Sequence, residues 1–256
     1  AYTRQMQLKG GTRLMNRLRN CIPVALLCYA TALGACASAA GNERVIERTV
    51  PAGKARELVV KASVGDIRVV TGGADDVVLR LQVKAKEYRS WLLVSRQGDP
   101  SQAELVAETA GDALRFELRY PGDRDGIEED WSLEVPARLA ARITLGVGSV
   151  RVRGIAGGVL LKVNVGEIEA EVPGGNIEAE VNVGDIRATT GSNSYERIRL
   201  DANVGDAKII GADSGAVRHS SGYGPGSSAS LDGDGRDRIR LEVNVGDASL
   251  SIRGAH

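Results

Sequence analysis

Aromatic residues are scarce in this sequence, whose 256 residues include two Trp, one Phe and six Tyr. A core of normal size must therefore be built from Val, Ile, Leu and Ala, which suits repetitive β packing better than an irregular α/β interior. Glycine is abundant, with 32 residues, so turns should be frequent. Apolar and polar residues alternate through much of the chain after residue 43. These features predict an all-β fold.

Cysteine is confined to the N-terminal segment, where it occurs at Cys21, Cys28 and Cys36. The rest of the chain offers no thiol for a disulfide, a metal site or a nucleophile. Packing and hydrogen bonds must then supply the stability, and we expect no cofactor.

The net charge is zero, but the charges are unevenly distributed. Residues 1–35 carry five basic residues and no acidic one, which leaves 28 basic against 33 acidic residues in the remainder, a balance of −5. A mildly acidic body repels backbone phosphates, so we expect no nucleic-acid partner.

An apolar run from Ile22 to Leu33 follows the basic residues. It has the length of a signal-peptide core and is too short to span a bilayer. We therefore expect residues 1–35 to be an export signal, with the true start at Met15.

The end of this run, "LGAC" at residues 33–36, resembles a bacterial lipobox. The resemblance implies that Cys36 is lipidated and that its acyl chains anchor the protein to a membrane, with residues 36–43 as a tether. Ala37, rather than Asp, follows the cysteine, which resembles the outer-membrane sorting pattern of Gram-negative lipoproteins. The alternative is ordinary cleavage near Ser38, which would discard Cys36.

A V-G-D phrase recurs through the chain. Copies from residue 148 onward are separated by 18, 18, 21 and 41 residues, and fixed spacing of this kind indicates a structural repeat. The longest interval equals about two units, so its middle, residues 211–235, is predicted to be a degenerate, loop-rich coil. The glycines of the copies, predicted as structural corners, are Gly65, Gly148, Gly166, Gly184, Gly205 and Gly246.

Residues 163–188 show how one unit is built, because the period halves there to nine residues. At each corner, two residues instead of one separate the inward positions, so the chain must bend, and glycine permits the bend at little steric cost. Each nonapeptide is then one strand and one corner, and 18 residues make a two-sided coil. The positions predicted to face inward are Val163, Val165, Ile168, Ala170, Val172, Ile177, Ala179, Val181, Val183, Ile186 and Ala188.

One coil cannot bury its apolar side alone, so coils must stack through strand pairing. We therefore predict a β-solenoid of two-sided coils, about 18 to 21 residues each, over residues 143–256. A less regular β region should precede it over residues 44–142. Outward asparagines in such a stack form an amide ladder. They are Asn164, Asn182, Asn203 and Asn244.

The stretch "WSLEVPARLAARITLGVGSVRVRGIAGGVLLKVNVGEIEAEV" resembles the bacterial putative-adhesin family of envelope proteins, which carries repeated V-x-x-x-x-G-D-I-x-V units. The resemblance covers residues 55–254 and is interrupted between residues 86 and 130, where no repeat occurs. It implies a β-solenoid that faces the cell surface or the periplasm and has no established chemistry.

Acidic residues follow most of the corner glycines, and a carboxylate column is one way to bind calcium. Ser149 and Asn176 interrupt the series. We therefore expect the acidic side chains to cap turns by accepting backbone N–H groups, and we predict no metal site. The acidic residues are Asp66, Glu167, Asp185, Asp206 and Asp247.

Two further acidic stretches, residues 232–237 and 122–130, fail the spacing of a calcium-binding EF-hand loop. Arg236 and Ile127 stand where oxygen ligands are needed. We predict a turn in the first stretch and a solvated loop in the second.

Catalytic groups are few, so we predict that the protein is not an enzyme. His219 and His256 are the only imidazoles, and the serines after His219 lack the glycine that a nucleophile elbow requires two residues earlier. We expect His219 on the surface and Trp131, which shares the parity of Leu133, in the core. Charged residues of mixed sign, as on any solvated sheet, are Lys162, Glu169, Glu180, Arg187, Arg199 and Lys208.

These observations favour an exported, outer-membrane lipoprotein that presents a non-catalytic, adhesin-like or scaffold surface to an envelope protein or a glycan. Two alternatives stay open. One is a periplasmic accessory of an envelope-stress signalling system, and the other is a polysaccharide-degrading β-helix enzyme.

Overall fold

The computed structural model describes residues 39–40, 42–72, 75–86, 98–122, 126–191, 194–212, 215–221 and 225–253. The predicted signal peptide and lipidation site, together with Trp91 and His256, lie outside these ranges. The described residues form an all-β fold with one short 3-10 turn, η1 (Pro100–Gln102). This part of the chain contains no helix that is long and apolar enough to cross a membrane.

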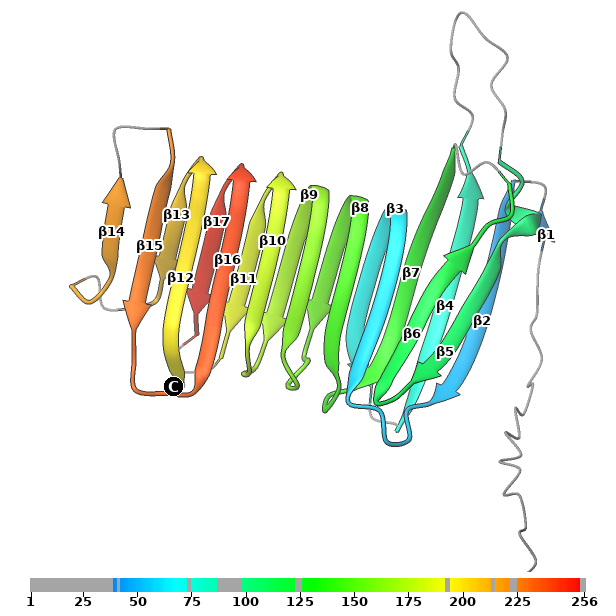
Figure 1. The fold of residues 1–256 in the computed structure, drawn as a ribbon, viewed down its shortest axis with the longest axis horizontal. Coiled ribbons are helices and arrows are strands. Elements are labelled where there is room, and N and C mark those ends of the chain that lie inside the picture. Colours follow the sequence, from blue (N-terminus) through cyan, green and yellow to red (C-terminus); the bar gives the residue numbers. More distant parts are fainter. Residues whose placement is uncertain are drawn as a thin grey trace, which may run out of the picture. The chain divides into compact units, whose positions relative to one another are not determined.

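Six strand–corner–strand coils form the centre of the fold (Figure 1). Three of them are single bent strands, and three are strand pairs interrupted at the corner. The bent strands are β3 (Glu57–Gly72), β8 (Ala140–Arg153) and β9 (Val159–Val172). The pairs are β10 (Ile177–Val183) with β11 (Ile186–Thr190), β12 (Tyr195–Val204) with β13 (Ala207–Ile210), and β16 (Asp237–Val245) with β17 (Ala248–Ile252).

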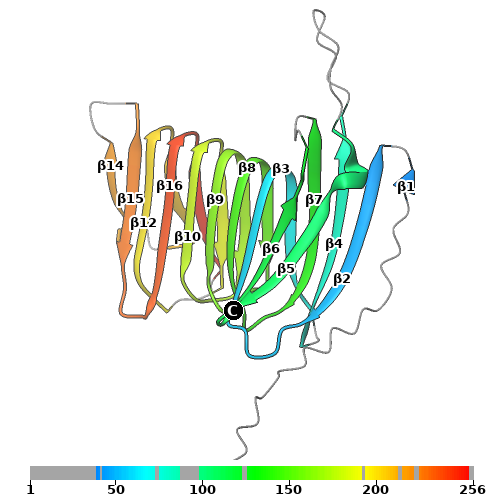
Figure 2. The same ribbon diagram turned by 45° about the vertical axis from the view of Figure 1, so that its right-hand side comes forward.

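Neighbouring coils pair in parallel, and the register matches the repeat. Val181 pairs with Val163 before the corner, and Ile186 pairs with Ile168 after it, each 18 residues apart along the chain. The halves before the corner form one layer, called layer A, and the halves after it form layer B (Figure 2). One continuous hydrophobic core draws its residues from both layers.

The coils do not stack in sequence order. β16 pairs with β10 on one side and with β12 on the other, and β17 lies likewise between β11 and β13. The last coil along the chain is therefore inserted between two earlier ones, as Figure 1 shows by the red strands among the yellow.

Residues 211–235 do not form the degenerate coil predicted from the 41-residue interval. Instead, β15 (Ser227–Asp232) pairs antiparallel with β12, and β14 (Arg218–Ser221) pairs antiparallel with β15. The physical reason is that this Gly- and Ser-rich segment has no V-G-D corner to carry the chain from layer A into layer B. It covers the end of layer A instead.

Further strands extend both layers at the opposite end; the first in each layer pairs in parallel with β3, and those beyond it are antiparallel. In layer A, β3 pairs with β6 (Ala113–Arg119), which pairs with β5 (Glu104–Ala110). In layer B, β3 pairs with β7 (Ile127–Pro136), followed by β4 (Asp76–Ala85), β2 (Glu43–Pro51) and β1 (Ala39–Ala40). β3 itself pairs in register with β8 from Glu57 to Val70, so the coil stack reaches into the region expected to be irregular.

Most of the predicted inward positions are buried. Val165 and Val183 are exceptions, with exposed fractions of 40% and 48%, so their prediction as core residues is wrong. Each directly precedes a corner glycine with a positive φ, and strict alternation does not continue through this bend. The buried positions are Val163, Ile168, Ala170, Val172, Ile177, Ala179, Val181, Ile186 and Ala188.

The acidic stretch 122–130 is only partly a loop, because β7 begins at Ile127. Ile127, Glu129 and Trp131 alternate into the core, and the Glu129 side chain is buried. Its carboxylate accepts a hydrogen bond from Trp131 Nε1 at 3.1 Å, which compensates for desolvation. The prediction of a solvated loop is therefore wrong for residues 127–130, whereas Trp131 is confirmed as a core residue.

Candidate interaction surface

The corner glycines stack directly on one another along the coils. Their φ angles are 131° to 139°, a region that residues with a side chain rarely adopt. A Cβ atom on Gly184 would lie 1.9 Å from the carbonyl oxygen of Gly166, and corresponding distances at the other stacked pairs are 1.8 to 2.0 Å. At the end of the column, a Cβ on Gly65 would lie 2.3 Å from the carbonyl oxygen of Glu129. Backbone packs against backbone here, which leaves no room for any side chain.

Three of the five carboxylates after these glycines accept hydrogen bonds from backbone amides of the next coil. Asp185 Oδ1 accepts from the Asp247 amide at 3.0 Å, and Asp247 Oδ1 accepts from the Asp206 amide at 2.8 Å. Asp66 Oδ1 likewise accepts from the Ser149 amide at 3.1 Å. The predicted acceptance of backbone N–H groups is confirmed for these three, with amides of a neighbouring coil, whereas Glu167 and Asp206 pair with Arg187 and Lys208. The described residues contain no group of three or more His, Cys, Asp or Glu side chains placed to hold a metal ion.

Asn176 does not belong to the acidic column, in contrast to its place in the predicted series. It lies at the opposite corner of its coil, just before β10. Its Oδ1 accepts a hydrogen bond from the amide of Arg238 at 2.8 Å, and the adjacent Gly175 amide donates to Asp237 Oδ2 at 2.9 Å. These two bonds hold the start of β16 against this corner.

The four predicted asparagines form a continuous ladder of exposed amides. Asn182 Nδ2 donates to Asn164 Oδ1 at 2.8 Å, and Asn244 Nδ2 donates to Asn182 Oδ1 at 2.8 Å. Asn203 Nδ2 then donates to Asn244 Oδ1 at 2.7 Å. The predicted amide ladder is therefore confirmed. Asn244 of the last coil lies between Asn182 and Asn203 of two earlier coils, in agreement with the strand pairing.

An exposed row of valines runs beside the asparagine ladder. Each valine directly precedes a corner glycine, pairs in register with the next one, and is 40% to 48% exposed. With about 4.8 Å between strands, six valines extend over about 24 Å. We call this row the valine stripe; in stack order it comprises Val64, Val147, Val165, Val183, Val245 and Val204.

The sequence contains the signal for the valine stripe, but alternation hides it. Counting every second residue as inward places Val165 in the core with Val163. The better signal is the Val-Gly pair repeated at all six corners, in which the valine already belongs to the corner. The valine stripe and the asparagine ladder together form one face, which we call the corner face.

On the outer surfaces of both layers, side chains of opposite charge form ion pairs. Lys162 Nζ lies 2.5 Å from Glu180 Oε2 on the next coil, and this hydrogen bond raises the pKa of Lys162. Arg187 pairs with both Glu167 and Asp185 at 3.3 and 3.0 Å. Such exposed pairs contribute little to stability and are typical of a solvated sheet, as predicted for these positions.

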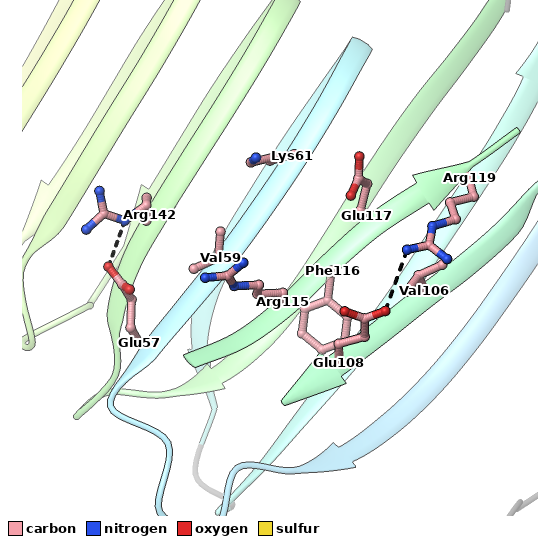
Figure 3. Close-up of a pocket in the computed structure, with 10 residues that line it drawn as sticks. All are labelled: Glu57, Val59, Lys61, Val106, Glu108, Arg115, Phe116, Glu117, Arg119 and Arg142. Atoms are coloured by element: carbon pink, nitrogen blue, oxygen red, sulfur yellow. Dashed lines mark hydrogen bonds and ion pairs between the residues drawn. The ribbon is translucent and has the colours of Figure 1, made fainter. Parts of the chain in front are cut away.

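A hollow of about 410 Å³ lies on the outer side of layer A, between β3, β5, β6 and β8 (Figure 3). Val59 is buried on its floor, between Arg142 of β8 and Arg115 of β6 in the register of the sheet. Arg142 pairs with Glu57 at 2.8 Å, and a second arginine pair lies across the hollow. None of the ten lining residues is Ser, Cys or His, so the hollow holds no hydroxyl or thiol nucleophile beside an imidazole.

His219 is on the exposed strand β14, where its backbone pairs with that of Ala229. Ser220 and Ser221 follow it and are exposed as well. The prediction of His219 as a surface residue is confirmed.

No family model and no curated protein matches this chain. A solved "putative cell adhesion protein" from Clostridium sporogenes has a similar structure, with a TM-score of 0.51 and 12% identity over 82% of this chain and 100% of that one. At this identity the likeness concerns the fold alone.

Two further solved structures match with TM-scores below 0.5. One is a "putative adhesin" from Bacteroides fragilis, with a TM-score of 0.23 and 10% identity over 80% of this chain and 96% of that one. The other is a "putative lipid binding protein" from Parabacteroides distasonis, with a TM-score of 0.25 and 8% identity over 84% of this chain and 98% of that one. Neither match carries an argument about function.

Proposed function

We propose that this protein is an exported β-solenoid, anchored to the outer membrane through Cys36, which presents a non-catalytic, adhesin-like or scaffold surface to a protein or a glycan of the cell envelope. The observation that supports this proposal best is the corner face. Six coils place identical apolar side chains in one exposed row there, beside a ladder of amides.

Exposed apolar side chains in a contiguous row are a common mark of an interaction site, whereas isolated ones are not. Here the row is built on stacked backbone, so binding would cost little ordering of the surface. The asparagine amides supply polar contacts along one side of the stripe. A rigid row of contacts without a reactive group fits adhesion or scaffolding better than catalysis.

The corner face is tested by exchanging Val165, Val183 and Val245 for threonine, which keeps the β-branched shape but removes apolar surface. Threonine suits strands as well as valine does, so the melting temperature should stay unchanged. Binding of the purified protein to isolated cell envelopes should weaken at least about tenfold, equivalent to about 1.4 kcal/mol.

The matched control exchanges Lys162 and Lys208, on the charged outer surfaces, for glutamine. This control should bind envelopes like the wild type. Equal binding by the threonine variant and the wild type would place the interaction elsewhere, and release of reducing ends from envelope polysaccharide would contradict the non-catalytic proposal.

The anchor is tested separately by the change Cys36→Ser. Without a lipid on this residue, the protein should move from the membrane fraction to the soluble fraction of the cell. Continued sedimentation with membranes would contradict lipidation at Cys36 while leaving the corner-face proposal intact.

A further inference from the structure

The inserted coil, residues 237–252, is held on both sides by coils that precede it in the chain. Gly184 N donates to Val245 O at 2.8 Å on one side, and Gly246 N donates to Val204 O at 2.8 Å on the other. The asparagine ladder crosses both interfaces as well. We call the space that this coil occupies the slot.

The slot requires apolar residues at the inward positions of the coil that fills it, because coils lie on both sides. The inserted coil meets this requirement, since Val243 and Leu250 are buried. The neighbouring coil 195–210 has the smaller Ala202 and the partly exposed Ile209 at the paired positions. It also contains a bulge at its start, near Tyr195. The later coil lies inside the stack, and the earlier one lies between it and β15.

A short link, residues 233–236, joins the inserted coil to β15 and passes over the start of β12 (Figure 1). We call this link the strap. Gly233 N donates to Glu196 O at 3.0 Å, and Gly235 N donates to Tyr195 O at 2.9 Å. A Cβ on Gly235 would lie 2.1 Å from the Ser194 carbonyl carbon. The strap therefore lies so close to β12 that it tolerates no side chain at this position.

We propose that the inserted coil exchanges between two copies of this chain, so that residues 237–252 of each copy fill the slot of the other and the strap acts as the hinge. The main-chain bonds and the amide ladder join this coil to coils 177–190 and 195–210, to Ser194 and to the corner before β10, and a second copy presents the same groups. Exchange keeps these interactions and replaces only the path of the strap. This is the condition under which an identical element passes between protomers at low cost.

The exchange is tested with two preparations of the full chain, in each of which Cys21, Cys28 and Cys36 are changed to serine. One preparation carries Asn182→Cys and the other carries Asn244→Cys. Paired strands lie about 4.8 Å apart, within the range that a disulfide bridges. The two preparations are mixed, partly unfolded in urea, refolded and oxidised, and the yield of disulfide-linked heterodimer is measured on a non-reducing gel.

The control mixture carries Asn164→Cys in one preparation and Asn182→Cys in the other. These positions are neighbours within coils that follow one another in sequence, so the proposed exchange does not bring them together between copies. Heterodimer in the 182/244 mixture well above this background, with a dimer mass by light scattering, is the expected result. Equal yields in the two mixtures would overturn the proposal.

Gly235→Ala tests the strap as the hinge, with Gly111→Ala as its control because a Cβ on Gly111 meets no atom within 4 Å. The side chain at position 235 should open the strap and raise the heterodimer yield several-fold over the wild-type strap. Gly111→Ala should leave the yield unchanged. If Gly235→Ala does not fold, the mixtures with the wild-type strap decide the proposal by themselves.

Discussion

At the scale of single residues, the corner glycines do more than permit a turn. Each has a positive φ and also lies against the backbone of the next coil, so two independent constraints exclude a side chain. A glycine chosen only for its conformation, such as Gly111, meets just the first constraint. The stack therefore depends on these residues for contact between coils as well as for chain direction.

Gly184→Ala should accordingly destabilise the protein by about 2 to 6 kcal/mol, the sum of backbone strain and overpacking. Gly111→Ala should cost only about 1 to 2 kcal/mol, because it meets left-handed strain without a clash. Urea unfolding followed by circular dichroism measures both. Similar losses for the two variants would contradict direct packing of the corner backbones.

The same corners show which buried and exposed positions could be predicted from the sequence. The buried positions Val163 and Ile168 follow from alternation and were predicted correctly. Val165 was not, because alternation assumes an extended backbone, and the glycine that follows it has a φ of 139°. The candidate surface was missed for this reason, although its asparagine ladder was predicted.

At the scale of strands, exposed ion pairs tie the C-terminal strands of layer A together. Asp232 at the end of β15 pairs with Arg197 of β12 and Arg218 of β14 at 2.8 and 3.1 Å. Glu196 of β12 pairs with Arg238 of β16 at 2.8 Å. The hydrogen bond from Arg197 lowers the pKa of Asp232, and the hydrogen bond from Arg238 lowers the pKa of Glu196.

Exposed pairs of this kind contribute little to stability, so acid should loosen these end strands only slightly, and before the rest of the stack. A carboxyl group whose pKa is lowered by folding stabilises the folded state at pH values above its pKa in the unfolded chain, which is about 4 for Asp. This contribution disappears as the pH falls through the lower pKa of the folded state. Hydrogen exchange in β15, corrected for intrinsic rates, should become faster below about pH 4, while β8 and β9 stay protected.

The control for this effect is the double change Arg197→Gln and Arg218→Gln. It should return the pKa of Asp232, followed by carboxyl NMR titration, towards the ordinary value for aspartate. Uniform loss of protection through all strands at low pH would show that these pairs do not set the local response.

At the scale of the whole molecule, the order of the coils is the feature that the sequence did not reveal. The 18-residue spacing predicted the register between β9 and β10, because equivalent residues must pair for the core to be continuous. The order of the last two coils in the stack could not be predicted in this way. Coils 195–210 and 237–252 present the same V-G-D corner and the same asparagine, so ladder matching permits either order.

Side-chain size does not explain the observed order, because the interior coil 177–190 has Ala179 and Ala188 paired with Leu241 and Leu250. The antiparallel strands β14 and β15 then cover the outer edge of β12, which would otherwise be open to pairing with another chain. Neither arrangement follows from periodicity, since both depend on contacts between segments that are distant along the chain.

The inserted order is tested most directly by paired cysteines within one chain, with Cys21, Cys28 and Cys36 changed to serine. Asn182→Cys with Asn244→Cys should form a disulfide within the monomer at low protein concentration, because these positions lie on paired strands. Asn182→Cys with Asn203→Cys should stay reduced, since two strand spacings, about 9.6 Å, separate them. The opposite pattern, a bond between positions 182 and 203 and none between 182 and 244, would show that the coils stack in sequence order.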